Sequence, residues 1–329
     1  MTHKRRILSG MRPTGPLHLG NLHGALLNWV DMQDDYDCFF FIADWHALTS
    51  DYEDPGRISG FIRELMIDWL SVGLTPEKST LFVQSLVKEH AELFLLLSMI
   101  TPVPWLERNP TYKDQLVQLD SKDLSTFGFL GYPVLQAADI IIYKAHGVPV
   151  GVDQVPHVEI TREIARRFNY LYGEVFPEPK EMLTATPKIL GMDRRKMSKS
   201  YHNAIFLKDG TDEIAAKVSR MITDPQRKRR SDPGDPGVCN VFEFHKIYTE
   251  PEKVAEIDPA CRSAEIGCVE CKQIMADRLA NALAPIREKR RYYEARPELV
   301  EEIITAGSDC ARDTARKTIE EVRQVVGLE

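Results

Sequence analysis

The sequence predicts an α/β protein in which a doubly wound parallel sheet is followed by a helical domain. The first half of the 329 residues alternates short apolar runs with amphipathic stretches of helical spacing, which is typical of a parallel sheet covered by helices. After about residue 200 the strand signal fades and helical segments dominate. The length also exceeds that of one minimal domain, which favours a large domain with a smaller one attached.

Each expected element follows from its own residues. Short apolar runs predict strands over Arg6–Ser9, Cys38–Ala43, Thr80–Val83 and Val148–Val152. Asp54 with Pro55 supplies a cap and a first-turn proline for one helix. Helical periodicity predicts helices over Leu22–Asp34, Pro55–Leu74, Pro133–Tyr143, Gln154–Phe168, Thr211–Met221, Lys272–Tyr293 and Ala311–Val326.

Composition narrows the class of protein. Hydrophobic residues make up 43% and charged residues 28%, and no apolar run approaches the roughly 18 residues of a membrane helix. The basic N-terminus runs into Gly10 and Pro13 without a long apolar stretch, so we expect a soluble, cytoplasmic protein without a secretory signal.

A formal net charge of -7 argues against nonspecific coating of nucleic acid, so any RNA contact must be local. Two basic clusters could serve it, although the ordinary interpretation of each is a solvated surface. They are Arg227–Arg230, and Arg287 with Lys289, Arg290 and Arg291.

A turn rich in small residues follows the first expected strand, from Ser9 to Asn21. His18 and Gly20 open a helix there, and the N–H groups and dipole at a helix start can hold an anion. Gly20 lets a ligand approach the backbone closely. A lone histidine at such a junction is more often only a cap, so this turn alone is a weak signal.

A charged loop, Lys196-Met197-Ser198-Lys199-Ser200, follows the expected sheet. Its two lysines could neutralise the charge of a departing pyrophosphate. An arbitrary run of this kind is more often an exposed loop, but its occurrence in one chain with the His18 turn favours nucleotide chemistry.

These two segments resemble the signatures of class I aminoacyl-tRNA synthetases, the H-x-G-H motif and the K-M-S-K-S loop, and the second matches letter for letter. Asn21 replaces the last histidine of the first motif, a change common in tryptophan-type members. The resemblance implies a Rossmann-type domain that uses ATP and Mg2+, in which an amino-acid carboxylate attacks the α-phosphorus and pyrophosphate leaves. It implies catalytic roles for His18, Asn21, Lys196 and Lys199, and ATP contacts from these four and from Arg12, Thr14, Gly20, Met197, Ser198 and Ser200.

Two further stretches, from Tyr132 to Ile140 and from Gly147 to Gln154, resemble the amino-acid pocket of the tryptophan and tyrosine enzymes. Tyr132, Gln136 and Asp139 share one helix face, a spacing that an ordinary amphipathic helix also shows. In the family, the aspartate at the Asp139 position accepts a hydrogen bond from the substrate ring. The residues at the Tyr132 and Gln154 positions hold the α-amino and carboxylate ends.

Likeness over Met11–Gly15, Ala43–Thr49 and Glu107–Asp114 favours the bacterial tryptophan type. The resemblance therefore implies L-tryptophan as substrate and tRNA(Trp) as partner. The implied tryptophan-binding residues are His46, Tyr132, Gln136, Asp139, Asp153 and Gln154.

Four of the six cysteines have the spacing C-x21-C-x6-C-x2-C. They are Cys239, Cys261, Cys268 and Cys271. Free thiols, a structural Zn2+ and an iron-sulfur cluster are the alternatives, since four thiolates suit either metal, and spacing alone favours zinc. Resemblance to bacterial tryptophan-type enzymes with a similar pattern implies a 4Fe-4S cluster near the anticodon site. Cys38 and Cys310 are expected to be ordinary thiols.

The resemblance spans nearly the whole chain and implies its organisation. We expect a catalytic domain over 1–200, with a dimer-interface region at about 86–145, and a helical, cysteine-cluster, anticodon-binding domain over 201–302. A C-terminal helix over 303–329 is expected to pack back on the catalytic domain, and a homodimer follows by family analogy. The alternatives are a tyrosine-specific synthetase and an RNA-binding relative that has lost aminoacylation.

Overall fold

The computed structural model describes residues 4–110, 112–113, 124–183 and 189–328. Its residues form two compact units, each discontinuous in sequence. Unit 1 comprises residues 1–15, 27–185 and 295–329, and unit 2 comprises residues 16–26 and 186–294. The three domain ranges expected from the sequence stay a prediction. Thr111 and Asp114, which contribute to the likeness over Glu107–Asp114, lie outside the described residues, as do residues 115–123 of the expected dimer-interface region.

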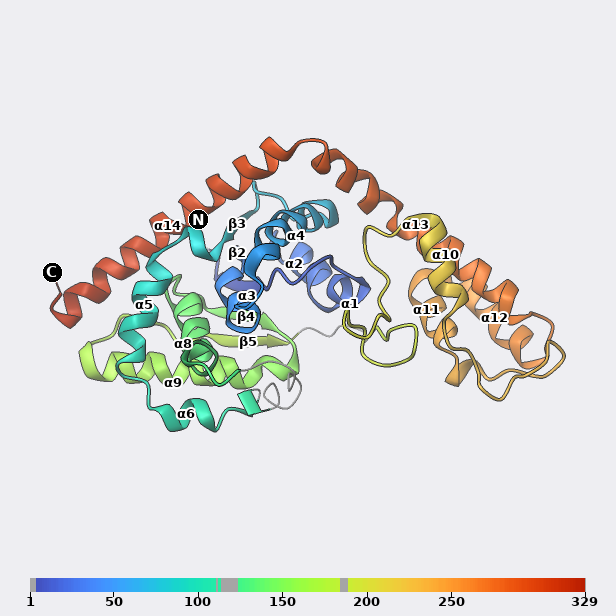
Figure 1. Cartoon of the computed structure of the whole chain (residues 1–329), viewed down its shortest axis with the longest axis horizontal. Coiled ribbons are helices and arrows are strands. Elements are labelled where there is room, and N and C mark those ends of the chain that lie inside the picture. Colours follow the sequence, from blue (N-terminus) through green and yellow to red (C-terminus); the bar gives the residue numbers. More distant parts are fainter. Residues whose placement is uncertain (1–3, 111, 114–123, 184–188, 329) are drawn as a thin grey trace. The chain divides into compact units, whose positions relative to one another are not determined.

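Unit 1 is built on a parallel five-stranded sheet in the order β3-β2-β1-β4-β5 (Figure 1). The strands are β1 (Arg6–Met11), β2 (Asp37–Ile42), β3 (Ser79–Val83), β4 (Gly147–Val150) and β5 (Lys180–Leu183). The strand order reverses at β1, so the gap between the ends of β1 and β4 is the switch point at which such sheets bind ligands. The expected doubly wound parallel sheet is confirmed.

Both faces of this sheet are covered, which explains the continuous apolar run of β2. Phe40 stacks on Trp29 of the preceding helix, with 4.6 Å between the ring centroids. Phe39 points to the opposite face, where its ring lies 5.0 Å from that of Tyr143. Neither face of β2 is left for polar side chains.

Helices surround the sheet of unit 1. They are α2 (Leu27–Met32), α3 (Asp44–Asp51), α4 (Ile58–Val72), α5 (Glu89–Ser98), α6 (Val103–Glu107), α8 (Phe127–Ile141), α9 (Val155–Tyr172) and α14 (Pro297–Val326). Helix α8 begins before the expected Pro133 because the Thr126 hydroxyl caps it, accepting a hydrogen bond from the Phe129 N–H at 3.2 Å. Helix α14 begins at Pro297, in the first-turn position that proline favours, and not at Ala311.

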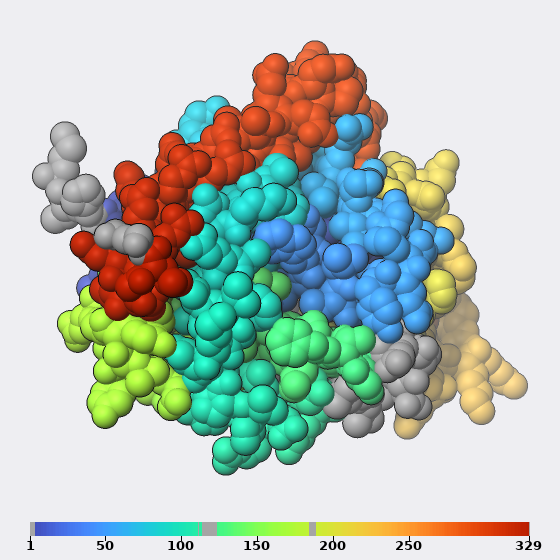
Figure 2. All heavy atoms as spheres, turned by 60° about the vertical axis from the view of Figure 1, so that its left-hand side comes forward, coloured from blue at the N-terminus to red at the C-terminus, as the bar shows by residue number. Residues whose placement is uncertain are grey.

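Helix α14 packs along the edge strand β3. It also lies beside α5 (Figure 2). Helix α14 and β3 approach closely at Gly307, where a Cβ atom would lie 1.9 Å from the carbonyl oxygen of Leu81. The Val83 N–H donates to Ser308 Oγ at 3.4 Å. An edge strand exposes backbone groups that can pair with other chains, and α14 covers those of β3.

Unit 2 is helical among its described residues. It contains α1 (Leu19–Asn21) followed by a π-helical turn (Leu22–Leu26), and then α10 (Thr211–Ser219), α11 (Asn240–Tyr248), α12 (Pro251–Arg262) and α13 (Cys268–Glu294). Helix α13 packs against α10 and α11, with Leu279 and Leu283 buried. The π-helical turn interrupts the helix that the sequence predicts over Leu22–Asp34. No helix in the described ranges is long and apolar enough to cross a membrane.

Candidate functional site

The His18 turn is fixed by a short segment of unit 2 that is distant in sequence. His18 pairs with Phe206 in an antiparallel bridge, and the Leu19 N–H donates to the Ile205 carbonyl oxygen at 3.0 Å. The Asn21 side chain accepts a hydrogen bond from the His18 N–H at 3.1 Å. Asn21 therefore caps this turn, at the position where the family motif has its last histidine.

The His18 imidazole is buried beside the K-M-S-K-S loop. A Cβ atom on Gly20 would lie 3.0 Å from the imidazole, a tight contact, and 3.5 Å from the Met197 Cβ, so the turn and the loop lie side by side at this glycine. Burial, and then the charge of Lys199, lower the pKa of His18 to about 4. The ring is thus neutral at pH 7, and its buried Nδ1 has no hydrogen-bond partner among the described residues.

Asn203, a residue that the sequence did not single out, holds the K-M-S-K-S loop in shape. Its side-chain oxygen accepts from the Ser198 N–H at 2.8 Å, and its amide nitrogen donates to Asp193 at 2.7 Å and to the Lys196 carbonyl at 3.2 Å. Gly191 is required beside it, because a Cβ there would lie 2.3 Å from the Asn203 amide nitrogen. Ser198 and Ser200 exchange a hydrogen bond at 2.9 Å.

In unit 1, polar residues follow the carboxyl ends of four neighbouring strands. They are Arg12 after β1, His46 near the end of β2, Gln84 after β3, and Asp153 with Gln154 after β4. Because the carboxyl ends of parallel strands meet at one edge of the sheet, these residues share the edge that holds the switch point. The Arg12 guanidinium lies 3.4 Å from Ser50 Oγ, and Thr14 is exposed.

Asp139 on α8 is completely buried in a hydrogen-bonded network. His46 Nε2 donates to Oδ2 at 2.9 Å, and His90 Nδ1 donates to Oδ1 at 2.5 Å. Gln84 Nε2 lies 2.8 and 2.9 Å from the two carboxylate oxygens. Burial by itself raises the pKa of Asp139, but the hydrogen bonds and charges of the two histidines outweigh it, so that pKa is lowered.

This network leaves the carboxylate little spare capacity. A carboxylate has about four acceptor positions, and His46, His90 and Gln84 occupy at least three. His90 is held in turn by the Tyr143 hydroxyl at 2.7 Å from its Nε2. Gln84, His90 and Tyr143 were not predicted as site residues, since nothing in their spacing links them to Asp139.

A second series of polar contacts holds the Tyr132 side chain in place. Its hydroxyl lies 3.1 Å from His157 Nε2, and Asn109 Nδ2 lies 3.2 Å from His157 Nδ1. Burial lowers the pKa of His157 to about 4, with the His46 charge acting in the same direction and Asp153 opposing it. Burial raises the pKa of Tyr132, and the Arg12 charge opposes this rise, so Arg12 lies within electrostatic range of Tyr132.

The remaining expected tryptophan contacts are more exposed. Gln136 on α8 is half-buried. Asp153 and Gln154 lie in a short turn between β4 and α9, with Gln154 Nε2 donating to Asp153 Oδ2 at 3.3 Å. These side chains are therefore available to a ligand at the sheet edge.

The four cysteines of the spacing pattern lie on or directly before three helices of unit 2. Cys239 precedes α11, Cys261 is on α12, and Cys268 and Cys271 begin α13. Burial, and then the charges of Cys239, Cys261 and Cys268, raise the pKa of Cys271 to about 12. The four sulfur atoms therefore lie within electrostatic range of one another, and none forms a disulfide.

Other groups occupy part of the space around these thiols. Arg227 lies 3.7 Å from Cys261 Sγ, and His245 Nε2 lies 3.4 Å from Cys271 Sγ. A Cβ on Gly234 would lie 2.7 Å from Cys261 Sγ. Across the described ranges, no three histidine, cysteine, aspartate or glutamate side chains are arranged to hold a metal ion. Four cysteine thiolates are suitable ligands for a metal, but the positions of the four sulfur atoms in this structure are not those of a metal site.

The parallel sheet with polar residues at its carboxyl edge, and the His18 turn packed on a K-M-S-K-S loop, are the features of a class I aminoacyl-tRNA synthetase. The chain belongs to this family, because the family model described as tRNA synthetases class I (W and Y) matches residues 1–284.

Relatives match over nearly their full length. The tryptophan–tRNA ligase of Thermotoga maritima is 54% identical, over 98% of this chain and 99% of the relative. That of Aquifex aeolicus is 49% identical, over 98% of this chain and 100% of the relative. The crystal structure of tryptophanyl-tRNA synthetase from Campylobacter jejuni, complexed with ADP and tryptophan, is 33% identical, with a TM-score of 0.91 over 98% of this chain and 100% of that one.

Proposed function

We propose that the chain is a tryptophan–tRNA ligase. It activates L-tryptophan with ATP to tryptophanyl-adenylate, releases pyrophosphate, and transfers the tryptophanyl group to the 3' end of tRNA(Trp). The observation that carries the proposal is the packing of the K-M-S-K-S loop on the His18 turn, where a buried neutral imidazole has an unpaired nitrogen close to the loop. A buried polar atom without a partner indicates a ligand that completes its hydrogen bonding.

The residues of the His18 turn and of the K-M-S-K-S loop have distinct parts in this reaction. Lys196 and Lys199 stabilise the negative charge that develops as pyrophosphate leaves, and His18 donates a hydrogen bond to a phosphate oxygen without adding charge. Gly20 leaves the backbone open to the nucleotide. Asn203 and Asn21 fix the loop and the turn, so the charges need no reorganisation during the reaction. When bound, Mg2+ shares the charge of the polyphosphate.

Amino-acid selection is assigned to unit 1. We propose that the network of His46, Gln84 and Asp139 recognises the indole N–H, and that Tyr132 and Gln154 hold the α-amino and carboxylate groups, with Gln136 and Asp153 beside them. The complete burial of Asp139 supports this assignment, because a buried acceptor rejects a ring that offers no donor. A phenol hydroxyl is also a donor, so a tyrosine substrate is the alternative.

Amino-acid-dependent pyrophosphate exchange tests the proposal. We expect exchange with tryptophan and at least about 100-fold lower kcat/KM with tyrosine, because the site is built around one ring. Charging of tRNA(Trp) transcript should then follow the same preference. Exchange with tyrosine and none with tryptophan would show a tyrosine-specific synthetase instead. No exchange with either amino acid would rule out both functions.

We further propose that Cys239, Cys261, Cys268 and Cys271 hold a 4Fe-4S cluster, with a structural Zn2+ as the alternative. Their convergence from three helices supports a shared ligand, and binding would require the sulfur atoms to move into ligand geometry. The test is elemental analysis of protein purified without oxygen. About four iron and four sulfide per chain are expected, and stoichiometric zinc without iron would decide for the alternative.

A homodimer is also proposed. Apolar side chains on α5 and around α6 support it, since Leu95, Met99 and Val103 are 54%, 69% and 51% exposed. Light scattering should give twice the mass of one chain, and Met99→Glu should weaken the association.

A further inference from the structure

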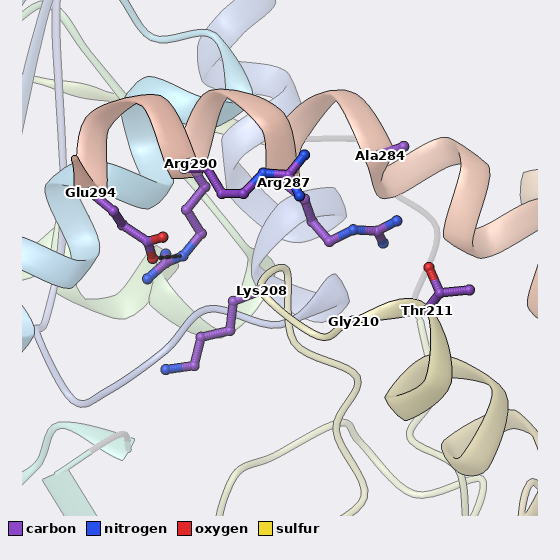
Figure 3. Close-up of a pocket in the computed structure, with 8 residues that line it drawn as sticks. Lys208, Gly210, Thr211, Ala284, Arg287, Arg290 and Glu294 are labelled. Carbon is purple, nitrogen blue, oxygen red and sulfur yellow. Dashed lines mark ion pairs between the residues drawn. The ribbon is translucent and has the colours of Figure 1, made fainter.

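A basic cavity of about 340 Å³ lies in unit 2 between α13 and the start of α10 (Figure 3). Its lining contains the four cationic side chains of Lys208, Arg287, Arg290 and Arg291, and a single carboxylate, Glu294. The volume is within the range of small-ligand pockets, which begins at about 300 Å³. A concave site with this excess of positive charge, on a chain whose formal net charge is -7, indicates an anionic ligand.

The arginines of this cavity are held in position by the surrounding protein. Arg290 is only 3% exposed, and its Nε pairs with Glu294 at 2.9 Å. Arg287 donates to the Ala280 carbonyl at 2.9 Å and lies 3.5 Å from the Asp209 carbonyl. The residues of α13 that line the cavity recur at helical spacing, so they share one face. Prepositioned guanidinium groups lose little freedom when they bind a phosphate.

Gly210 and Thr211 line the floor of the cavity at the N-terminus of α10. The Gly210 N–H donates to the Glu213 carboxylate at 2.9 Å, and Asp212 lies in the same first turn, so the positive charge of the cavity comes from its lysine and arginine side chains. The nearby Asp209 carboxylate is offset by Lys217, 2.5 Å away. Lys208 stands two residues after Phe206, whose backbone pairs with His18, so one short segment fixes the His18 turn and leads into the cavity.

We propose that this cavity binds a phosphate group. The clustered arginine and lysine side chains match the charge and the oxygen geometry of phosphate. Two sources share this chemistry, a phosphodiester of the tRNA backbone and a free polyphosphate, and the first rests on the function proposed above. Because the chain as a whole is acidic, RNA binding needs such local sites of positive charge.

The test compares the double variant K208Q/R291Q with wild type and with Lys289→Gln. Lys208 and Arg291 are both exposed, so their replacement should leave the fold intact, which circular dichroism checks. Lys289 is an exposed cation on the same helix that does not line the cavity, so it is a control for loss of charge alone. Filter binding of tRNA(Trp) transcript is measured over a series of KCl concentrations. Tripolyphosphate binding is measured by calorimetry with a saturating non-hydrolysable ATP analogue.

For a backbone phosphate, K208Q/R291Q should raise the Kd of the transcript about tenfold or more. It should also reduce the slope of log K against log salt by about one for each lost contact. Lys289→Gln should change the Kd less than about twofold. Loss of tripolyphosphate binding alone would assign the cavity to a free polyphosphate. If neither ligand is affected, or if Lys289→Gln has the same effect, the proposal is wrong. Pyrophosphate exchange by wild type needs no tRNA, so its absence would count against the proposed function and not against this cavity.

Discussion

Replacement of Asp139 tests both the stability of unit 1 and the recognition of the substrate. Asp139→Ala removes the acceptor that His46, His90 and Gln84 share. These three buried side chains then lose a hydrogen-bond partner that water cannot easily replace. Each buried donor left unsatisfied costs about 1–3 kcal/mol, and Asp139→Ala leaves three side chains without their shared acceptor. Because a protein of ordinary stability has only about 5–15 kcal/mol, we expect a loss of about 3–5 kcal/mol and partial unfolding.

Urea unfolding followed by circular dichroism measures this loss. Asp35→Ala, at an exposed aspartate, is the control and should change the free energy of unfolding by less than about 0.5 kcal/mol. Tyr143→Phe, which removes only the hydroxyl that holds His90, should cost about 1 kcal/mol. If Asp139→Ala were as stable as Asp35→Ala, the network would not exist as described.

The Asp139 network also makes the stability of the folded chain depend on pH. The pKa of Asp139 is lowered in the folded chain, so the unfolded chain binds this proton at a higher pH than the folded one. The charged carboxylate therefore contributes stability above its unfolded pKa of about 3.9, and this contribution is lost as the pH falls below that value. Asp139→Asn, which keeps the shape of the side chain, should remove this part of the acid sensitivity. In folded Asp139→Asn, an unchanged KM for tryptophan would refute the role of Asp139 as the indole acceptor.

Four further predictions concern other parts of the molecule. Lys199→Ala should slow pyrophosphate exchange about 100-fold while changing the KM for tryptophan little, and an equal loss in transfer from preformed adenylate to tRNA would contradict its role. Asn203→Ala, which releases the loop, should slow exchange about tenfold, and rapid-quench kinetics of adenylate formation would show whether the chemical step is affected. In urea unfolding, Gly307→Ala should lower the free energy of unfolding by about 1–3 kcal/mol, because the new methyl group would clash with the Leu81 carbonyl. Gly60→Ala on α4, where the space around the residue is open, should raise it by up to about 1 kcal/mol. Since the pKa of His157 is lowered to about 4, stability should fall as the pH decreases from about 6.5 to 4, and a titration in which His157→Gln showed the same slope would exclude this residue as the cause.

The parts of the fold that the sequence predicts well are those with a strong local pattern. The run from Cys38 to Ile42 is apolar at every position, and buried strands of a parallel sheet require this, so β2 differs from the prediction by a single residue at each end. The sequence does not predict strand β5, because its residues, Lys-Glu-Met-Leu, are half-exposed at the sheet edge and carry no such run. The first helix was expected to be continuous, because apolar periodicity alone does not distinguish a π-helical turn from regular helix.

The candidate site is less predictable because its residues meet through the tertiary fold. His90 and Gln84 are 49 and 55 residues from Asp139 in sequence. Gln84 does carry a usable signal, since it is the first polar residue after an apolar strand, where ligand residues gather in parallel sheets. His90 lies within a helix and has no such signal. The family resemblance implies which residues contact the substrate, but it does not imply which residues hold those in place.

The cover that α14 provides for β3 has a consequence for synthesis of the chain. Val83 and its partner Ser308 are separated by 225 residues. At translation rates of about 5–20 residues per second, the strand leaves the ribosome roughly 10–45 s before the helix that shields it. During that interval the backbone of β3 is open to strands of other nascent chains. Chaperones that bind unpaired strands should therefore associate with ribosome-bound chains that end before Pro297, and should dissociate once α14 has emerged.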